Sequence, residues 1–100
     1  MAKVIVMPRL DVSSEKCVFM KWLKEINEFI EVGEPVFEVE SDKCTLEVES
    51  IYEGYLLEKI AEPNNEYVIG AAVGIIGEKN KKYSKEKLLG KKLLFNNEEG

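Results

Sequence analysis

The sequence predicts an all-β domain, a small flattened barrel or sandwich of two similar four-stranded halves related by pseudo-two-fold symmetry. Three observations lead to this prediction: short runs of alternating apolar and polar residues, frequent turn residues between them, and an internal repeat. We expect the domain to occupy residues 1–77, with no long helix. Residues 78–100 are interpreted as a lysine-rich linker or the truncated start of a following region.

The candidate strands are short and separated by glycine, proline and asparagine. In chain order they are residues 4–7, 17–23, 36–41, 45–50, 55–60 and 73–76. Alternation is clearest in 36–41 and 45–50, which predicts that each of these strands buries one face. Asn27, Gly33, Gly54 and Gly70 are the turn residues on which the division into strands depends.

The first half of the sequence recurs in the second. Residues 17–20 align with 54–57, and Gly33 aligns with Gly70, in both cases 37 positions later. Residues 29–30 resemble 67–68 at an offset of 38, and Val4 and Val6 align with Leu46 and Val48 at an offset of 42. Five additional residues of the first half would therefore form a loop near 11–15. The repeat indicates a duplicated unit whose halves pack together, with chance similarity among valine-rich strands as the alternative.

Composition excludes several classes of function. Residues 1–77 hold 7 basic and 15 acidic residues, a net charge of −8, which argues against a nucleic-acid partner. The chain has no histidine, and Cys17 and Cys44 form no CxxC pair, so we expect no metal site and no histidine-dependent catalysis. We expect both thiols to be free and buried or half-buried in a reducing compartment, with a disulfide as the alternative. No signal peptide or membrane span is recognisable, and we expect a cytoplasmic, bacterial protein with no membrane partner.

A tight hairpin is the singular feature of this pattern. With Asp42-Lys43 as a two-residue turn, Glu40 faces Thr45, Val39 faces Leu46 and Phe37 faces Val48. Phe37, Val39, Leu46 and Val48 then share a buried face. Glu38, Glu40, Glu47 and Glu49 share the opposite face. Lys43 is predicted at the hairpin tip, where a modifying enzyme can reach its amine.

The sequence as a whole resembles the lipoyl domains of dihydrolipoamide acyltransferases from 2-oxo acid dehydrogenase complexes. The resemblance covers roughly residues 3–77. It rests on Met7-Pro8-Arg9-Leu10, on Trp22, on Gly33-Glu34, on Glu40-Ser41-Asp42-Lys43-Cys44-Thr45, and on Glu47, Glu49-Ser50, Gly54 and Gly70. It implies lipoate in amide linkage to Lys43, with Glu40, Asp42 and Cys44 as flanking recognition residues.

The resemblance further implies a carrier that is not a catalyst by itself but part of an acyltransferase. Lys43 would be modified by a lipoate ligase or lipoyl transferase. Its swinging arm would then serve a thiamine-diphosphate 2-oxo acid decarboxylase, the acyltransferase catalytic core and dihydrolipoamide dehydrogenase, in a pyruvate, acetoin or branched-chain system. Candidate partner-recognition residues are Asp11, Val12, Ser13, Ser14, Glu15, Glu38 and Glu47.

Some positions depart from the family pattern, and three alternative functions stay open. Cys17 and Asn27 replace glycines, so we expect a relaxed or strained turn at Cys17 and a left-handed residue at Asn27. Ser14 replaces a common methionine, and Cys44 replaces alanine as a small space filler or as a thiol able to exchange with a dithiolane. One alternative is a biotin carrier domain, in which the modified lysine usually has a methionine on each side. Another is an unmodified lipoyl-like interaction module. An enzyme with Cys44 as nucleophile is the weakest alternative.

Overall fold

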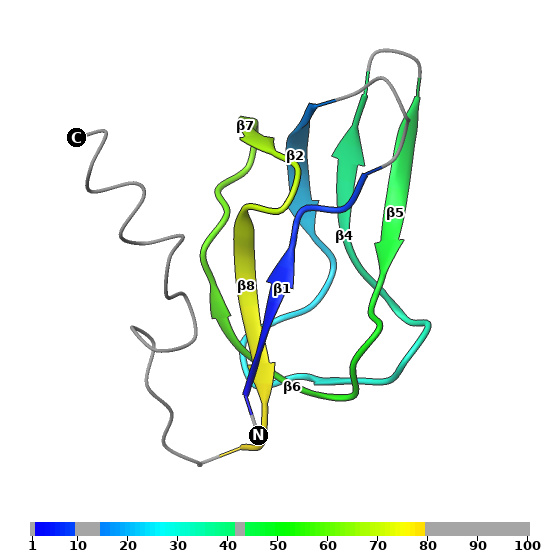
Figure 1. Ribbon diagram of the computed structural model, residues 1–100. Helices are drawn as coiled ribbons and strands as arrows, with labels where there is room; N and C mark the ends of the chain where they lie inside the picture. Colours follow the sequence, from blue (N-terminus) through cyan, green and yellow to red (C-terminus); the bar gives the residue numbers. More distant parts are fainter. Residues whose placement is uncertain (1, 10–14, 42–43, 80–100) are drawn as a thin grey trace, which may run out of the picture.

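A computed structural model describes residues 2–9, 15–41 and 44–79, and every regular element in these ranges is a β-strand. Figure 1 shows the strands in chain order. They are β1 (Lys3–Val6), β2 (Lys16–Trp22), β3 (Phe29–Ile30), β4 (Pro35–Glu40), β5 (Thr45–Glu49), β6 (Gly54–Lys59), β7 (Asn65–Val68) and β8 (Ala72–Gly77). The predicted all-β class is confirmed.

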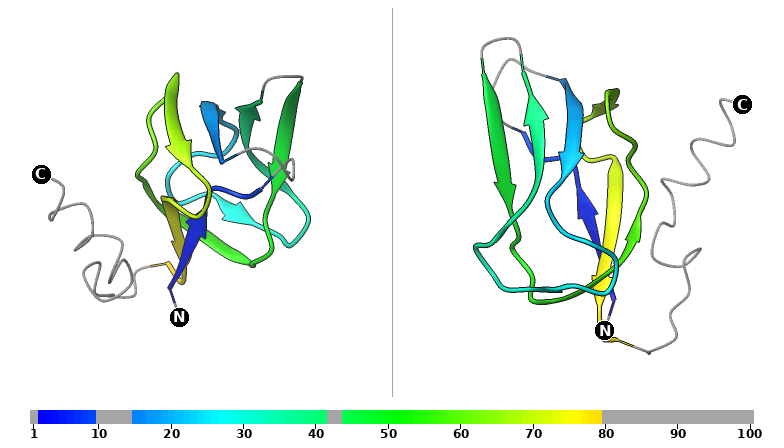
Figure 2. Two further views of the ribbon diagram at one scale, coloured as in Figure 1. Left: turned by 45° about the horizontal axis from the view of Figure 1, so that its top comes forward. Right: turned by 180° about the vertical axis from the view of Figure 1, so that it is seen from behind.

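The strands form two four-stranded antiparallel sheets that face each other as a flattened sandwich (Figure 2). One sheet has the order β1-β8-β6-β3 and the other β5-β4-β2-β7. Exchanging β1 with β5, β2 with β6, β3 with β7 and β4 with β8 converts the strand order of each sheet into that of the other. This is the predicted pseudo-two-fold symmetry. Each sheet contains two strands from each half, so the halves interleave and do not correspond to separate sheets.

The repeat governs the backbone hydrogen bonds as well as the strand order. The amide of Leu23 donates to Val36 O, and 37 residues later Ile60 donates to Val73 O at nearly the same distance, 2.8 and 2.9 Å. The glycines of the repeat are equivalent too, since Gly33 and Gly70 have φ of 90° and 89°. The alignment at 37 positions is therefore a structural equivalence.

Two other offsets predicted from the sequence are wrong by one residue. Lys3 pairs with Ile76, and Leu46 pairs with Val39, the residue 37 positions before Ile76. Lys3 is therefore equivalent to Leu46, so β1 matches β5 at an offset of 43, not 42. The first half consequently has six additional residues between β1 and β2. In the same way, Ile30 pairs with Gly54, and Tyr67 pairs with Cys17, the residue equivalent to Gly54. Ile30 is therefore equivalent to Tyr67, at an offset of 37, not 38. The run Lys-Val-Ile-Val in β1 lacks the alternation that would have set its register.

The core lies between the sheets and is not symmetric. Three aromatic rings fill the part lined by β2 and β4: Phe19 lies 5.2 Å from Phe37 and 5.1 Å from Trp22, measured between centroids. Phe19 and Phe37 are fully buried. Their equivalents in the second half are Leu56 and Gly74, so the aromatic rings of one half occupy space left by small or aliphatic residues of the other.

Two positions at which the sequence departs from the family pattern, Asn27 and Cys17, differ in backbone conformation. Asn27 has φ of 71°, so the predicted left-handed conformation is confirmed. Cys17 is buried in β2 and is not among the described residues with positive φ, so the expectation of a relaxed or strained turn there is wrong. Strands β3 and β7 were not among the six candidate strands, because one has two residues and the other begins with Asn65-Glu66.

Candidate functional site

The β4–β5 hairpin has the predicted register. Phe37 pairs with Val48, Glu38 with Glu47, Val39 with Leu46, and Glu40 with Thr45. Beyond the last pair the amide of Ser41 donates to Cys44 O at 2.9 Å. The connection between Ser41 and Cys44 thus consists of the two residues Asp42 and Lys43, which themselves lie outside the described residues.

The two strands of the hairpin differ in burial. Phe37 and Val39 of β4 are fully buried, whereas Leu46 of β5 remains 40% exposed and Val48 is half-buried. The prediction that all four side chains bury together is therefore wrong for Leu46. The reason is the position of β5 at the edge of its sheet, where no strand covers its outer side.

Carboxylates line the solvent side of the hairpin. Glu40, Glu47 and Glu49 are exposed, and Glu38 is half-buried between Glu47 on β5 and Lys21 on β2. The like-charge pair Glu38–Glu47 opposes strand pairing, and on its other side Glu38 pairs with the basic residue Lys21. The predicted acidic face is present, and the basic residue Lys21 adjoins it on β2.

The other predicted recognition residues divide between described and undescribed parts of the chain. Asp11, Val12, Ser13 and Ser14 lie outside the described residues. Glu15 is exposed, and its backbone carbonyl accepts a hydrogen bond from Ile69 N at 2.9 Å. It precedes β2 at the same end of the sandwich as the hairpin turn, since Val18 pairs with Glu40 (Figure 1).

The two cysteines occupy different environments and are not bonded to each other. Cys17 is buried in the core and Cys44 is exposed. The expectation of two buried or half-buried thiols is thus wrong for Cys44, and so is its interpretation as a space filler. The Cys44 thiol lies 3.9 Å from the Ser41 hydroxyl, and that hydroxyl also donates to Cys44 O at 3.4 Å. These contacts join the two residues that flank the Asp42-Lys43 connection.

The described residues lack a metal site and a membrane-spanning helix. They contain no cluster of three or more candidate metal ligands. In the same ranges no helix could span a membrane. A groove of about 220 Å³ between β1 and the β4–β5 hairpin is largely apolar. Its buried polar group, the Ser50 hydroxyl, already bonds to the backbone of Tyr52.

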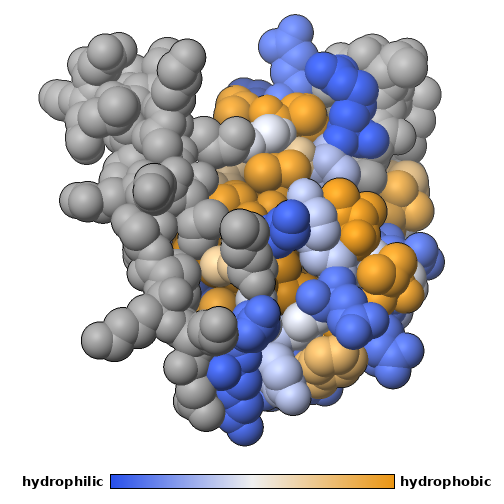
Figure 3. All heavy atoms as spheres, turned by 60° about the horizontal axis from the view of Figure 1, so that its bottom comes forward, coloured by the Kyte–Doolittle hydropathy of each residue, from blue (hydrophilic) through white to orange (hydrophobic). Residues whose placement is uncertain are grey.

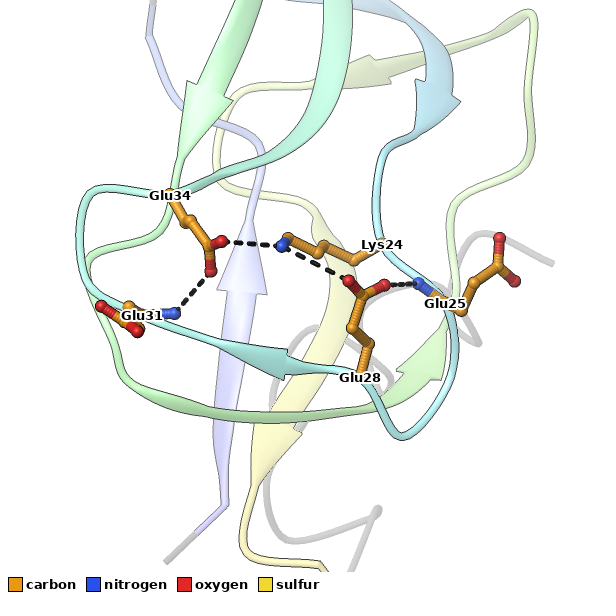
Figure 4. Close-up of polar contacts among 5 residues, drawn as sticks. All are labelled: Lys24, Glu25, Glu28, Glu31 and Glu34. Carbon is orange, nitrogen blue, oxygen red and sulfur yellow. Dashed lines mark hydrogen bonds and ion pairs between the residues drawn. The ribbon is translucent and has the colours of Figure 1, made fainter.

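A polar network that the sequence analysis did not predict lies at the end of the sandwich opposite the β4–β5 hairpin turn (Figure 4). The Lys24 ammonium lies 2.9 Å from a Glu34 carboxylate oxygen and 3.5 Å from Glu28. Both carboxylates also accept backbone amides, Glu34 from Glu31 and Glu28 from Glu25. The position equivalent to Lys24 in the second half is Ala61, so this network belongs to one half only.

The network shifts two pKa values in opposite directions. The Glu31 amide, and then the Lys24 ammonium, lower the pKa of Glu34. The hydrogen bond to Glu34 raises the pKa of Lys24. The spacing of four glutamates at every third position from Glu25 to Glu34 was a signal that could have pointed to this network.

The chain is similar to known proteins over most of the described residues. The biotin/lipoyl family model, described as "Biotin-requiring enzyme", matches residues 3–73. The dihydrolipoyllysine-residue acetyltransferase component of the pyruvate dehydrogenase complex of Corynebacterium glutamicum is 36% identical over 78% of this chain. The succinyltransferase component of the 2-oxoglutarate dehydrogenase complex of Staphylococcus saprophyticus is 32% identical over 71% of it. The chain spans only 12% and 17% of the length of these relatives.

A solved structure shares the fold. It is the solution structure of the lipoyl domain of the 2-oxoglutarate dehydrogenase complex from Azotobacter vinelandii, with a TM-score of 0.61 and 22% identity. The match covers 76% of this chain and 96% of that one. The two interleaved sheets described above are therefore the architecture of that domain.

Proposed function

The chain belongs to the biotin/lipoyl attachment family, and from this premise we propose that it is a lipoyl carrier domain with Lys43 as the attachment residue. One observation carries the proposal. The β4–β5 register and the Ser41–Cys44 hydrogen bond leave Asp42-Lys43 as the whole connection of a regular hairpin. A lysine in a two-residue connection between paired strands is expected at the hairpin tip, where a modifying enzyme can reach its amine.

The residues around the attachment position suit a flexible covalent group. Ser41 is half-buried and Cys44 is exposed, so the strand ends reach solvent where the connection begins. Below them Phe37 and Val39 fix the hairpin in the core, which gives the tethered group a stiff base. In amide linkage to Lys43, lipoate would supply a dithiolane whose two-electron reduction is coupled to the uptake of an acyl group.

Lipoate is favoured over biotin by the relatives and by the residues at the turn. The matching relatives named above are dihydrolipoyllysine-residue acyltransferase components. Lys43 is flanked by Asp42 and Cys44, not by the methionines usual in biotin carriers. An unmodified interaction module would not require a lysine at this position.

We further propose that the parent protein is an acyltransferase component of a 2-oxo acid dehydrogenase complex in the cytoplasm. Its partners would then be a lipoate ligase or lipoyl transferase, a thiamine-diphosphate decarboxylase, the acyltransferase core and a dihydrolipoamide dehydrogenase. The exposed carboxylates of β4 and β5, with Glu15 at the same end, are the surface these partners would meet first. Complementary basic surfaces would raise the rate of encounter, and this attraction would weaken with salt.

The attachment residue is tested by intact and peptide mass spectrometry after co-expression with a lipoate ligase and lipoate. One lipoyl increment is expected on the wild-type chain, mapped to Lys43 and lost in Lys43→Arg. Lys21→Arg is the matched control, because Lys21 is exposed on the neighbouring strand of the same sheet and should not affect modification. A folded chain that an active ligase leaves unmodified would contradict the proposal, and biotin ligase would then be tried.

A further inference from the structure

Strand β5 is the longest of the four edge strands, and no described strand pairs with its outer side (Figure 1). The other edges are shorter or irregular. Strand β3 has two residues, β7 has four, and the pairing of β1 is interrupted between Ile5 and Val6. Short and irregular edges are protected against pairing with another chain. The pairing of β5 is regular from Thr45 to Val48, so its backbone lacks this protection.

The backbone groups of every second residue of β5 face away from β4. The Ser41 amide donates to Cys44 O at the hairpin end. Hydrogen-bonded positions alternate along an antiparallel pair, so from Cys44 onward every second residue bonds toward β4. The residues between them, whose amides and carbonyls point outward, are Thr45, Glu47 and Glu49. The described backbone supplies no partner for these outward groups.

The same residues carry side chains on the acidic face. Thr45, Glu47 and Glu49 are all exposed. Antiparallel pairing of β5 with the β5 of a second copy, centred on Glu47, would place this carboxylate opposite its own equivalent, which is unfavourable. A strand that pairs with β5 should instead present basic side chains on the solvent face, each opposite a glutamate.

The opposite face of such a strand would lie over the groove between β1 and the β4–β5 hairpin. The groove measures about 220 Å³, and its lining includes Val4, Val6, Pro8, Val48, Ile51 and Tyr52. Apolar side chains are also exposed at the end of the sandwich opposite the hairpin turn, where Ile51 is 76% exposed (Figure 3). Because side chains alternate across a strand, the residues between the basic ones would point toward this groove and should be apolar.

We propose that the β5 edge binds an extended peptide segment of a partner protein, in which basic and apolar residues alternate, as an added antiparallel strand. Its backbone bonds to the outward groups of β5, its basic side chains face Glu47 and Glu49, and its apolar side chains enter the groove. In this mode of recognition main-chain hydrogen bonds give affinity and alternate side chains give specificity. Lys3 lies at the groove end distant from the hairpin turn, 5.5 Å from the Tyr52 ring centroid, so the basic residues belong nearer the turn.

An NMR titration of the full 100-residue chain with the peptide acetyl-Lys-Val-Lys-Val-Lys-Val-Lys-amide tests the proposal. Amide hydrogen exchange at Thr45, Glu47 and Glu49 should be fast in the free chain and at least about 10-fold slower at saturation. The amides of Leu46 and Val48, which bond toward β4, should change little. Unchanged exchange at the three outward residues would overturn the proposal.

Two N-methylated peptides of equal charge separate strand addition from charge attraction. Methyl groups on the lysine backbone nitrogens remove the donors that face β5 and should abolish the protection. Methyl groups on the valine backbone nitrogens, which face away from β5, should leave it in place. Equal binding of the two peptides would overturn strand addition. Binding of the peptide with glutamate in place of lysine would overturn the charge component.

Two variants of the chain test the same hydrogen bonds from the other side. Glu47→Gln removes a charge and keeps the outward amide, so binding should weaken about 2–5-fold. Glu47→Pro removes the amide as well and should abolish binding, and proline is tolerated at an edge position whose N–H faces solvent. Glu66→Gln on β7 is the control and should bind as wild type does. Equal affinities of Glu47→Gln and Glu47→Pro would overturn backbone bonding.

Hydrogen exchange in the free chain identifies any other occupant of the β5 edge. Slow exchange at Thr45, Glu47 and Glu49 that disappears on dilution would assign the edge to a second copy. Slow exchange that persists on dilution would assign it to another segment of this chain. Either result would overturn the proposal. Lys43 has no part in these readouts, so they are independent of lipoylation and of the proposed carrier function.

Discussion

Asn27 and Asn64, 37 residues apart, hold the same left-handed conformation and make the same hydrogen bond to the opposite half of the repeat. Their φ values are 71° and 70°. Asn27 N donates to Leu56 O at 2.6 Å, and Asn64 N donates to Phe19 O at 2.7 Å. Leu56 and Phe19 are themselves equivalent, so each half of the repeat supplies the turn that fixes a core strand of the other.

Alanine at either asparagine should destabilise the fold by the same amount. Alanine tolerates the left-handed region less well than asparagine, so Asn27→Ala and Asn64→Ala should each lower the free energy of unfolding by about 1 kcal/mol. Glycine at either position should change it little, because freedom in the unfolded chain offsets the relief of strain. Urea denaturation measures both, and a loss confined to one site would contradict the equivalence.

Gly74 makes room for Trp22. A Cβ added at Gly74 would lie 2.7 Å from a ring carbon of Trp22 and 2.9 Å from Glu58 O. Gly74→Ala should therefore lower the free energy of unfolding by about 1–3 kcal/mol through overpacking. In a double-mutant cycle with Trp22→Phe, the double variant should lose less than the sum of the single losses. Strict additivity would show that the indole is not what the methyl group meets.

The Lys24–Glu34 pair should make stability depend on pH at both extremes. The pKa of Glu34 is lowered in the folded state, so its contribution is present above about pH 4.5, the ordinary value, and is lost as pH falls through the folded pKa. The pKa of Lys24 is raised, so its contribution is full below its ordinary pKa of 10.5 and is lost above the raised value. Urea midpoints of Glu34→Gln and wild type should differ at pH 7 and converge near pH 2.

Glu66→Gln is the control for that comparison. Glu66 pairs with Lys16 at 3.4 Å through side chains that are both more than half exposed, so its removal should matter little. If Glu34→Gln and Glu66→Gln gave the same pH profile, the network around Lys24 would have no special part in acid stability.

The two thiols should differ strongly in reactivity. Cys44 is exposed and Cys17 is buried, so an aromatic disulfide reagent should titrate one thiol in the native chain and two in denaturant. Cys17 should react at least about 1000-fold more slowly than Cys44, because it requires an opening reaction of the core. Cys44→Ser should remove the fast phase alone. A fast phase that survives in Cys44→Ser would contradict the burial of Cys17.

Glu47→Lys should have opposite effects on the stability of the hairpin and on its recognition by a decarboxylase partner. Replacing one member of the Glu38–Glu47 pair removes a cross-strand repulsion and should raise the free energy of unfolding by about 0.2–1 kcal/mol. The rate of reductive acylation by a decarboxylase partner should fall if the acidic face is recognised. Glu62→Lys, an exposed charge in the turn before β7, is the matched control. An acylation rate unchanged in Glu47→Lys would assign the acidic face to solubility.

Alternation explains which parts of this fold could be read from the sequence. Glutamates alternate with apolar residues over residues 37–40 of β4 and 46–49 of β5. A two-residue connection leaves one register that satisfies both strands, so the pairing of Glu38 with Glu47 could be predicted. In β1 the run Val-Ile-Val fits either register, and the alignment was wrong by one residue. The exposure of Leu46 and Cys44 could not be predicted, because it depends on which strand lies at the sheet edge.

The candidate site was predictable where it depended on local pattern and not where it depended on tertiary contacts. The hairpin and its acidic face follow from residues 36–50 alone. The Lys24 network requires the 23–34 segment to turn back on itself, with Asn27 in a left-handed conformation, before Lys24 can meet both Glu28 and Glu34. From the sequence alone, Lys24, whose amine contacts both carboxylates, could not be distinguished from the other lysines of the chain.

The interleaving of the two halves has a consequence for folding. Because Lys3 pairs with Ile76, the sheet that contains β1 cannot be completed until nearly the whole described chain has been synthesised and brought together. Neither half can open alone without exposing the core strands of the other, so unfolding should be a single all-or-none transition. Pairings this distant in sequence also favour folding in milliseconds to seconds. A cut in the hairpin connection would leave two fragments that must associate to fold.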